Sequence, residues 1–353
     1  MPVPRLTKPN QLPPQPKLRK IAFEEHFLVP ECLKKDVNGM ISQRDIEVHA
    51  EENGLTPQWF KQVYDRLMDF DDVRIESMNE SGIDFAILGF MCPGIQAIAD
   101  GSKAQDTAKA VNDALAKRVQ AHPDRFGGFA SLALHDVDAA VKELERCVKT
   151  LGFKGVMMNG FNQIGTGEDD VLYLDEDKCS PLWEALSDLE VPLYLHPRTP
   201  LQQRIYKDHK ELICANWGYA CETGTHAVRI LVGGVFDRFP KAKLVLGHNG
   251  ETLPFAAWRL QHWMEFNPGN DRPKKRIQDY LAENVYVTIS GDWSVPALLC
   301  TMQVCGTDRM LFSVDYPFEN MDEAAEFLEN APISEVDRAK IAYGNAKTLF
   351  KLD

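Results

Sequence analysis

Hydrophobic and polar positions follow two alternating patterns along the chain after Lys20. About eight short runs are apolar or β-branched throughout, which is typical of buried strands. They lie near residues 20–25, 83–89, 126–131, 153–158, 191–196, 242–247, 284–289 and 309–314. Segments between them, such as 106–121, 137–150 and 225–239, repeat apolar residues three or four positions apart, as amphipathic helices do. Strands that alternate with helices predict a parallel sheet.

The number of these units favours a closed α/β barrel. About eight units in 353 residues fit a (β/α)8 TIM barrel with insertions better than an open doubly wound sheet. No Gly-x-Gly-x-x-Gly follows the first run and no Walker loop is present, so nucleotide binding on an open sheet loses its main support. We therefore expect one barrel domain over residues 20–353, with its longest insertion from about Pro30 to Leu55, after the first strand.

The N-terminal segment, residues 1–19, differs from the rest of the chain. It holds six prolines among basic residues, and proline is compatible with neither helix interiors nor sheet ladders. We expect a disordered arm here; a targeting peptide or an arm that clasps a neighbouring subunit are the alternatives.

Charge and cysteine usage narrow the classes of partner. A formal net charge of −13 argues against nucleic acid and anionic membranes, because both need a local excess of Lys and Arg. No apolar run approaches the length of a membrane span, and no secretory signal precedes the first strand. The eight cysteines are scattered without a CxxC pair, so we expect thiols in a reducing, cytoplasmic setting.

Candidate metal ligands stand at the ends of several predicted strands. Glu24 and His26 close the first run two positions apart, so their side chains point the same way on an extended chain. His196 closes the fifth run and Asp315 the eighth. In a parallel barrel all these strand ends open on one face, which would gather two imidazoles and two carboxylates. Such a donor set suits Zn²⁺ or Mn²⁺.

Each of these residues has an ordinary structural explanation when taken alone. A histidine at a strand end is often a hydrogen-bonded core residue, and an aspartate there often caps the next helix. His248 follows the sixth run beside Gly247, which leaves it room to approach a ligand, and turn packing is its other role. Glu251 could orient His248, or could simply be an acidic residue that the helix dipole favours in the first turn of a helix. Arg259 could bind a substrate carboxylate or form a surface ion pair.

At these residues the chain resembles the amidohydrolase superfamily, and within it the metal-dependent nonoxidative decarboxylases of hydroxybenzoic acids, especially the γ-resorcylate (2,6-dihydroxybenzoate) type. The resemblance covers roughly residues 20–353. It rests on the segments Lys20–Phe27 (KIAFEEHF), Tyr194–Arg198 (YLHPR), Gly247–His248, Trp258–Arg259, Phe312–Glu319 (FSVDYPFE) and Asn345–Lys347 (NAK). The retained Glu-x-His pair favours the γ-resorcylate type over relatives that act on 2,3-dihydroxybenzoate or salicylate.

The resemblance implies a mechanism and a division of roles. Glu24, His26, His196 and Asp315 would bind one divalent ion, which chelates the substrate carboxylate and its ortho hydroxyl, with no organic cofactor. Asp315 would protonate the ring carbon that bears the carboxylate, and CO₂ would then leave. The residues matching His248 and Glu251 assist in that family, and the one matching Arg259 lies near the substrate. A homo-oligomer, a dimer or tetramer, is also implied.

Some features leave the substrate and the class of reaction open. Met157-Met158, Gly291-Asp292-Trp293 and the proline-rich arm depart from the γ-resorcylate type. Phe27 and Trp293 are candidates for the apolar wall of the pocket, or equally for core packing. A hydrolase of the same superfamily, in which the metal activates water and Asp315 accepts its proton, is the main rival. An inactive ligand-binding barrel is a third interpretation, which intact ligand positions disfavour.

Overall fold

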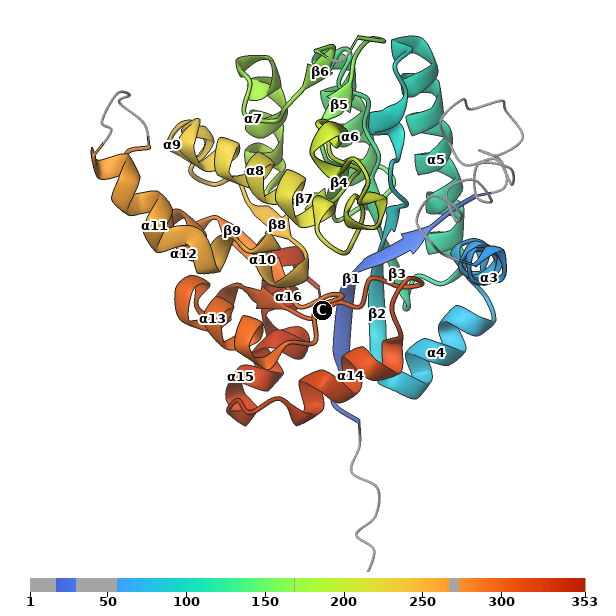
Figure 1. Ribbon diagram of the computed structural model, residues 1–353. Helices are drawn as coiled ribbons and strands as arrows, with labels where there is room; N and C mark the ends of the chain where they lie inside the picture. The colour runs from blue at the N-terminus through green and yellow to red at the C-terminus, as the bar shows by residue number, and fades with distance from the viewer. Residues whose placement is uncertain (1–16, 30–55, 168, 267–272, 353) are drawn as a thin grey trace, which may run out of the picture.

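The computed structural model describes residues 17–29, 56–167, 169–266 and 273–352 (Figure 1). Within these ranges eight parallel strands pair in the order β1-β2-β3-β4-β7-β8-β9-β10. Their bounds are β1 Lys20–Phe27, β2 Ile83–Phe90, β3 Phe126–Ala130, β4 Gly155–Asn159, β7 Leu193–His196, β8 Leu244–Leu246, β9 Val285–Thr288 and β10 Met310–Leu311. A small antiparallel pair, β5 (Asn162–Gln163) and β6 (Val171–Leu172), lies outside this sheet. Residues 1–16 of the expected arm and the whole insertion expected over 30–55 fall outside the described residues.

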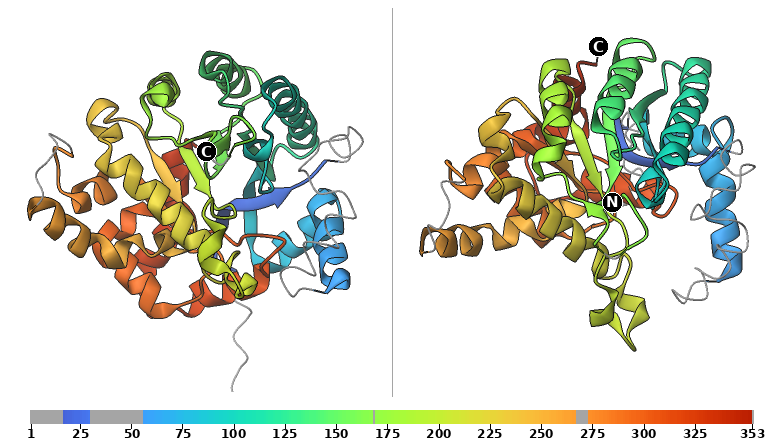
Figure 2. Two further views of the ribbon diagram at one scale, coloured as in Figure 1. Left: turned by 45° about the horizontal axis from the view of Figure 1, so that its top comes forward. Right: turned by 90° about the horizontal axis from the view of Figure 1, so that it is seen from above.

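Helices surround the strands on the outside (Figures 1 and 2). Their bounds are α3 Pro57–Met68, α4 Val73–Ser81, α5 Gly101–Ala121, α6 Val137–Lys149, α7 Ser180–Leu189, α8 Gly218–Val232, α9 Val235–Arg238, α10 His248–Glu251, α11 Leu253–Phe266, α12 Ile277–Glu283, α13 Val295–Cys305, α14 Met321–Asn330, α15 Glu335–Ala339 and α16 Asn345–Phe350. None of the helices described is long and apolar enough to cross a membrane.

The sheet closes on itself between its first and last strands. The backbone N–H of Asp315 donates to the carbonyl of Glu24 at 3.0 Å, and that of His26 donates to the carbonyl of Tyr316 at 2.7 Å. These bonds connect the C-terminal half of β1 to the chain just beyond β10. The prediction of a (β/α)8 barrel is therefore confirmed, and closure removes the exposed edges that an open sheet would have.

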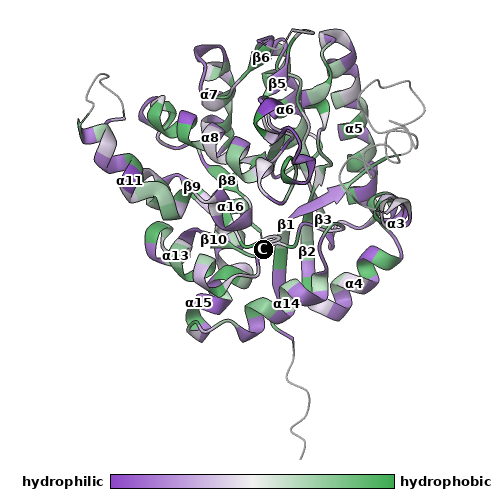
Figure 3. Cartoon of the chain, in the orientation of Figure 1, coloured by the Kyte–Doolittle hydropathy of each residue, from purple (hydrophilic) through white to green (hydrophobic). Residues whose placement is uncertain are grey.

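One extra residue in β1 changes which side chains face the barrel interior. Ala22 pairs with Ala86 and Glu25 with Leu88, so β1 holds one residue more than β2 between these two pairs. Such a bulge reverses the alternation of side chains along a strand. Phe23 below the bulge packs in the interior cluster, while Glu24 above it also faces inward, toward His196. Toward its arrowhead β1 is hydrophilic, unlike the strands beside it (Figure 3).

The end of the barrel opposite to Glu24 is filled by apolar side chains. Phe23, Phe129 and Tyr194 form part of an interior cluster that also contains residues of α16. The ring of Phe350 stacks on Phe23 at 4.6 Å between centroids and lies 5.9 Å from Phe129. The C-terminal helix thus closes this end of the barrel, and in Figure 1 the C-terminus lies over the centre of the strands.

The predicted helix over 225–239 is wrong in its extent. The helix begins earlier, at Gly218, and ends at Val232; the short helix α9 follows separately. Gly234 lies between them at φ 69°, a left-handed conformation that glycine adopts without steric cost and that interrupts a helix. The apolar period continues across the break because both helices pack on the same core, and this is why the pattern suggested one element.

Candidate metal centre and catalytic site

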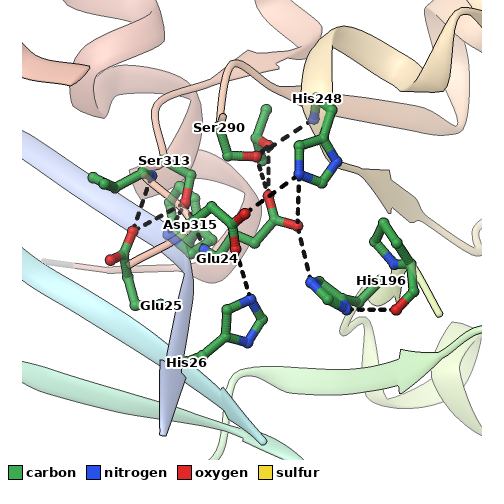
Figure 4. A network of polar contacts seen from close by, with 12 residues as sticks. Glu24, Glu25, His26, His196, His248, Ser290, Ser313 and Asp315 are labelled. Atoms are coloured by element: carbon green, nitrogen blue, oxygen red, sulfur yellow. Dashed lines mark hydrogen bonds and ion pairs between the residues drawn. The ribbon is translucent and has the colours of Figure 1, made fainter. Parts of the chain in front are cut away.

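Four side chains converge at the C-terminal ends of the strands. Glu24 and His26 come from β1, His196 ends β7, and Asp315 lies beyond β10. Each offers one ligand atom, and these four atoms all lie within 4.8 Å of one another. The side chains of Glu24, His26, His196 and Asp315 point toward one another in Figure 4. The four residues that the sequence proposed as metal ligands are therefore placed together.

The hydrogen bonds around these groups fit a cation. Nδ1 of His196 donates to the carbonyl of Pro197 at 2.9 Å, which leaves Nε2 with its lone pair, 3.5 Å from Oε1 of Glu24. Glu24 Oε1 is buried and has no hydrogen-bond partner. Burial, aided by His26, lowers the pKa of His196 well below its usual value, so this imidazole is neutral, the form that binds metals.

Glu24 lies against residues that only the folded chain brings together. Its Oε2 accepts hydrogen bonds from Ser290 and from Thr288, the latter at 3.4 Å. A Cβ on Gly247 would lie 2.9 Å from both carboxylate oxygens, so this position leaves room only for glycine. Burial and the nearby charge of Asp315 raise the pKa of Glu24, while His248 and His26 oppose that shift. A cation at this place would favour the ionised carboxylate.

His248 and Glu251 form a pair beside the four ligands. Nδ1 of His248 lies 2.6 Å from Oε1 of Glu251, and its Nε2 lies 3.7 Å from Oδ2 of Asp315. Burial alone would lower the pKa of His248, but the charges of Glu24 and Glu251, the contact with Asp315 and the hydrogen bond that His248 donates to Glu251 raise it well above its usual value. The surrounding carboxylates thus favour the imidazolium form of His248.

The backbone around this pair is unusual. His248, Asn249, Glu251 and Thr252 all have positive φ, between 49° and 65°, and Asp315 has φ 79°. Residues other than glycine seldom adopt this conformation, and such residues cluster at active sites where the surrounding structure holds them. Asn249 supplies part of that support, because its side chain donates to the carbonyl of Asp292 at 3.0 Å.

Asp315 is held between two histidines. Its Oδ1 lies 3.0 Å from Nε2 of His26, and its Oδ2 faces His248. Burial would raise its pKa, but the contacts with His248 and His26 hold the pKa well below its usual value. The sign of this effect could not be obtained from the sequence. The resting form of this residue is consequently the carboxylate.

Supporting residues that sequence reasoning missed hold β1 to the chain beyond β10. The buried carboxyl group of Glu25 accepts from the backbone N–H of Val314 at 3.0 Å and from Oγ of Ser313 at 3.2 Å. Ser313 Oγ also accepts from the backbone N–H groups of Phe23 and Glu24. Burial raises the pKa of Glu25 to about 8. Ser313 lies two positions before Asp315 in the segment that follows β10.

A cavity of about 1170 Å³ opens beside the cluster. Its wall includes His196, His248, Glu251, Asp315 and Phe318, so four of the predicted site residues face it directly. This places the cavity on the face of the barrel where the C-terminal ends of the strands meet, the usual position of active sites in this fold.

Three residues proposed to contact substrate lie away from the cavity. Phe27 is fully buried in the layer between barrel and helices, because the bulge in β1 directs it outward. Trp293 is half-buried, with its ring 5.9 Å from that of Phe327. Arg259 is exposed on α11, with its guanidinium 5.9 Å from the centre of the Trp263 ring. None of Phe27, Trp293 and Arg259 lines the cavity as the described residues define it.

Comparison with known proteins extends over almost the whole chain. A family model described as amidohydrolase matches residues 45–352. A γ-resorcylate decarboxylase of Polaromonas sp. (strain JS666) is 43% identical over 339 residues, which are 95% of this chain and 99% of that protein.

Solved structures show the same relationship. A crystal structure of 2,6-dihydroxybenzoate decarboxylase complexed with 2,6-dihydroxybenzoate has a TM-score of 0.85 and 41% identity, and covers 95% of this chain and 99% of that one. A dihydroxybenzoic acid decarboxylase of Polaromonas sp. JS666, with bound manganese and the inhibitor 2-nitroresorcinol, has a TM-score of 0.83 and 42% identity, and covers 95% of this chain and 97% of that one.

Proposed function

The chain belongs to the amidohydrolase family, together with the γ-resorcylate decarboxylases, and on that premise we propose that it catalyses the nonoxidative, reversible decarboxylation of an ortho-hydroxybenzoic acid such as 2,6-dihydroxybenzoate. It is a carboxy-lyase, as its relatives are. The observation that carries the proposal is the convergence of Glu24, His26, His196 and Asp315 beside the cavity.

A divalent cation is the cofactor that these four residues would hold. When bound, it supplies positive charge that attracts the substrate carboxylate and ortho hydroxyl and orients the ring. Its identity belongs to the proposal: imidazole and carboxylate donors in equal number suit Mn²⁺ or Zn²⁺, and one ion per chain is expected from a single cluster. Manganese is bound in the related Polaromonas structure.

The proton that the reaction needs comes from the pair formed by Asp315 and His248. Decarboxylation requires a proton on the ring carbon that bears the carboxylate; the bond to that carboxylate then breaks, its electrons return to the ring, and CO₂ leaves. Asp315 rests as a carboxylate, so it must first take up a proton, and the protonated His248 lies 3.7 Å away. Glu251 stabilises the charge of His248 between turnovers.

A hydrolase that uses the same residues is not favoured. In that reaction the site would direct a water proton to Asp315 rather than a proton from Asp315 to carbon. The relatives that are 41–43% identical to this chain are named decarboxylases. Fold alone does not separate the two reactions, because one barrel architecture serves both.

Metal analysis and CO₂ release together test the proposal. We would measure metals by plasma mass spectrometry on the purified chain, then follow CO₂ from 2,6-dihydroxybenzoate, 2,3-dihydroxybenzoate and salicylate with Mn²⁺ or Zn²⁺ restored after chelation. We expect about one ion per chain and CO₂ from at least one acid. His196→Ala should lose both metal and activity. Metal without CO₂ from any acid would overturn the decarboxylase assignment.

Helix α11 supports a second proposal, that two copies of the chain associate through it. Four large side chains on this helix are exposed: Phe255 by 87%, Trp258 by 67%, Trp263 by 56% and Phe266 by 69%. Apolar surface of this extent is uncommon on monomers and typical of interfaces, where aromatic residues and arginine are enriched. Arg259 lies among these side chains.

Sedimentation velocity tests this association. Trp258→Glu should lower the mass of the particle, because a charge placed in an apolar interface is costly to bury. Trp217→Glu, at a tryptophan exposed by 56% outside α11, is the matched control. An unchanged mass for Trp258→Glu would contradict the proposal.

The expected cytoplasmic location is consistent with the seven described cysteines, which are present as thiols, and cell fractionation would test it.

A further inference from the structure

A tyrosine and two thiols form a small polar cluster on the wall of the cavity. Tyr219, Cys92 and Cys214 all line the cavity, as His196 and Asp315 do. The hydroxyl group of Tyr219 is within hydrogen-bonding reach of both thiols. Cys92 follows β2, whereas Cys214 precedes α8 and Tyr219 lies in the first turn of that helix. No step of the proposed reaction uses these three side chains.

The backbone holds this cluster in place before any ligand binds. The N–H groups of Trp217 and Tyr219 both donate to the carbonyl of Cys214, each at 3.2 Å. A Cβ on Gly218 would lie only 2.1 Å from the carbonyl oxygen of Ile213, so this tight turn requires glycine. Gly218 is the first residue of α8 and Tyr219 is the second. A side chain fixed in this way loses little further freedom when it binds a ligand.

The cluster is neutral in a cavity that also holds acids. Burial raises the pKa of Cys92 to about 12 and raises that of Tyr219 well above its usual value, so both keep their protons at neutral pH. The acidic residues Asp292 and Glu319 also line the cavity. An anionic benzoate is repelled by ionised carboxylates, whereas a neutral hydroxyl group can bind it without that penalty.

The size of the cavity leaves selection to such polar groups. A volume of about 1170 Å³ exceeds the range of roughly 300–1,000 Å³ that holds drug-sized ligands, and a single substituted ring is smaller still. Walls that do not enclose the ring on all sides cannot reject a substrate for lacking one hydroxyl group. A hydrogen bond to that hydroxyl group can discriminate between substrates. A substrate without the hydroxyl group leaves its protein partner with a weaker hydrogen bond.

We propose that Tyr219 is a specificity-determining residue, whose hydroxyl group binds an oxygen substituent on the substrate ring beyond the carboxylate and its ortho hydroxyl. A thiol is a weak hydrogen-bonding partner. Tyr219 therefore forms a stronger hydrogen bond when a hydroxyl oxygen of the substrate replaces Cys92 or Cys214 as its partner. This inference rests on the proposed function, because it assumes a hydroxybenzoate in the cavity.

Tyr219→Phe tests this role in the metal-loaded enzyme. We would compare kcat/KM for salicylate, which lacks a second ring hydroxyl, with the values for 2,4-, 2,5- and 2,6-dihydroxybenzoate. The variant should lose roughly 3- to 10-fold for the isomer whose hydroxyl group reaches Tyr219, the range for one neutral hydrogen bond, and should change little for salicylate. Tyr206→Phe is the matched control, because Tyr206 also contacts a thiol, that of Cys221, but does not line the cavity.

The outcomes separate this inference from the function on which it rests. A loss confined to one isomer supports the role of Tyr219, and an equal change for all four acids overturns it. If wild type releases no CO₂ from any acid, the decarboxylase assignment fails, and titration calorimetry with the same four acids then decides whether Tyr219→Phe weakens the binding of one. Should Tyr219→Phe not fold, Cys92→Ser takes its place: a stronger partner for Tyr219 should reduce discrimination against salicylate.

Discussion

The two ends of the barrel are built from the same strands but solve different problems. At one end Phe23, Phe129 and Tyr194 fill the interior and Phe350 closes it, all buried and apolar. At the other end, one or two residues further along the same strands, Glu24 and His196 bring charged and polar groups into the interior. At the first end, burial of apolar surface stabilises the folded state. At the second end, buried polar atoms such as Glu24 Oε1 have no partners, which costs stability.

The comparison shows where stability and function are separated in this fold. Buried charges and left-handed residues at the catalytic end cost stability, and the well-packed apolar end offsets that cost. Substitutions at the catalytic end should therefore affect activity far more than folding, and substitutions at the closed end should do the reverse.

Asp315→Asn should cause the largest loss of activity. The amide cannot deliver a proton as the carboxyl group does, so turnover should fall by about 10²- to 10⁴-fold, the usual contribution of a general acid. The melting temperature should fall slightly, because His248 loses the charge of one of the three carboxylates around it. CO₂ release and calorimetry measure the two effects, and Asp177→Asn, at a side chain exposed by 92%, is the control. Turnover within threefold of wild type would remove Asp315 from the mechanism.

Phe350→Ala should have the opposite profile. Phe350 stacks on Phe23 and is 5% exposed, so its truncation should cost about 3–5 kcal/mol of unfolding free energy. Metal content and kcat at 25 °C should remain close to those of wild type. Urea unfolding with a metal assay measures both, and Phe350→Leu should lose less because it leaves a smaller cavity. A variant that unfolds normally yet loses metal would show that the two ends are coupled.

Glu251→Gln should weaken the catalytic end without dismantling it. The amide retains the shape of the carboxylate 2.6 Å from His248 but not its charge, so His248 is held protonated less firmly. Carboxylates that support a metal site in this way typically contribute 10- to 100-fold, and we expect a loss of kcat in that range. Kinetics at saturating substrate, with metal content measured in parallel, separate lost turnover from lost metal. A change in KM alone would contradict this role.

His226 gives a smaller, pH-dependent effect away from both ends. It is fully buried, and its Nε2 accepts from the backbone N–H of Leu174 at 2.9 Å. Burial, with a contribution from Arg229, lowers its pKa to about 3. Between pH 6.5 and 3 the unfolded chain therefore binds more protons than the folded chain, and stability falls as the pH falls.

The His226→Gln variant isolates this contribution. Gln can still accept the N–H of Leu174 but does not titrate. Between pH 7 and pH 5 wild type should lose about 2 kcal/mol more unfolding free energy than the variant, a difference measured by urea unfolding at both values. If the unfolding free energies of wild type and variant change equally with pH, His226 is protonated to the same extent in the folded and the unfolded chain.

The sequence by itself determined the class of fold and the chemistry of the site. Apolar runs alternating with amphipathic segments are sufficient for a parallel barrel, because buried parallel strands and their covering helices have different periods. Glu24, His26, His196 and Asp315 could be selected because each stands near the end of an apolar run, and the strand ends of a barrel meet on one face. Both inferences use only local periodicity and the geometry common to the architecture.

Only the tertiary structure decided which side chains face inward and in what state. The extra residue in β1 turns Phe27 outward, and a bulge is a property of strand pairing that one strand's sequence does not reveal. The protonation of Asp315 and His248 follows from charges that lie far apart in the chain and close together in space. The contact of Tyr219 with Cys92 likewise joins two distant segments. Burial and electrostatics depend on distances through space, and for that reason sequence spacing could not supply them.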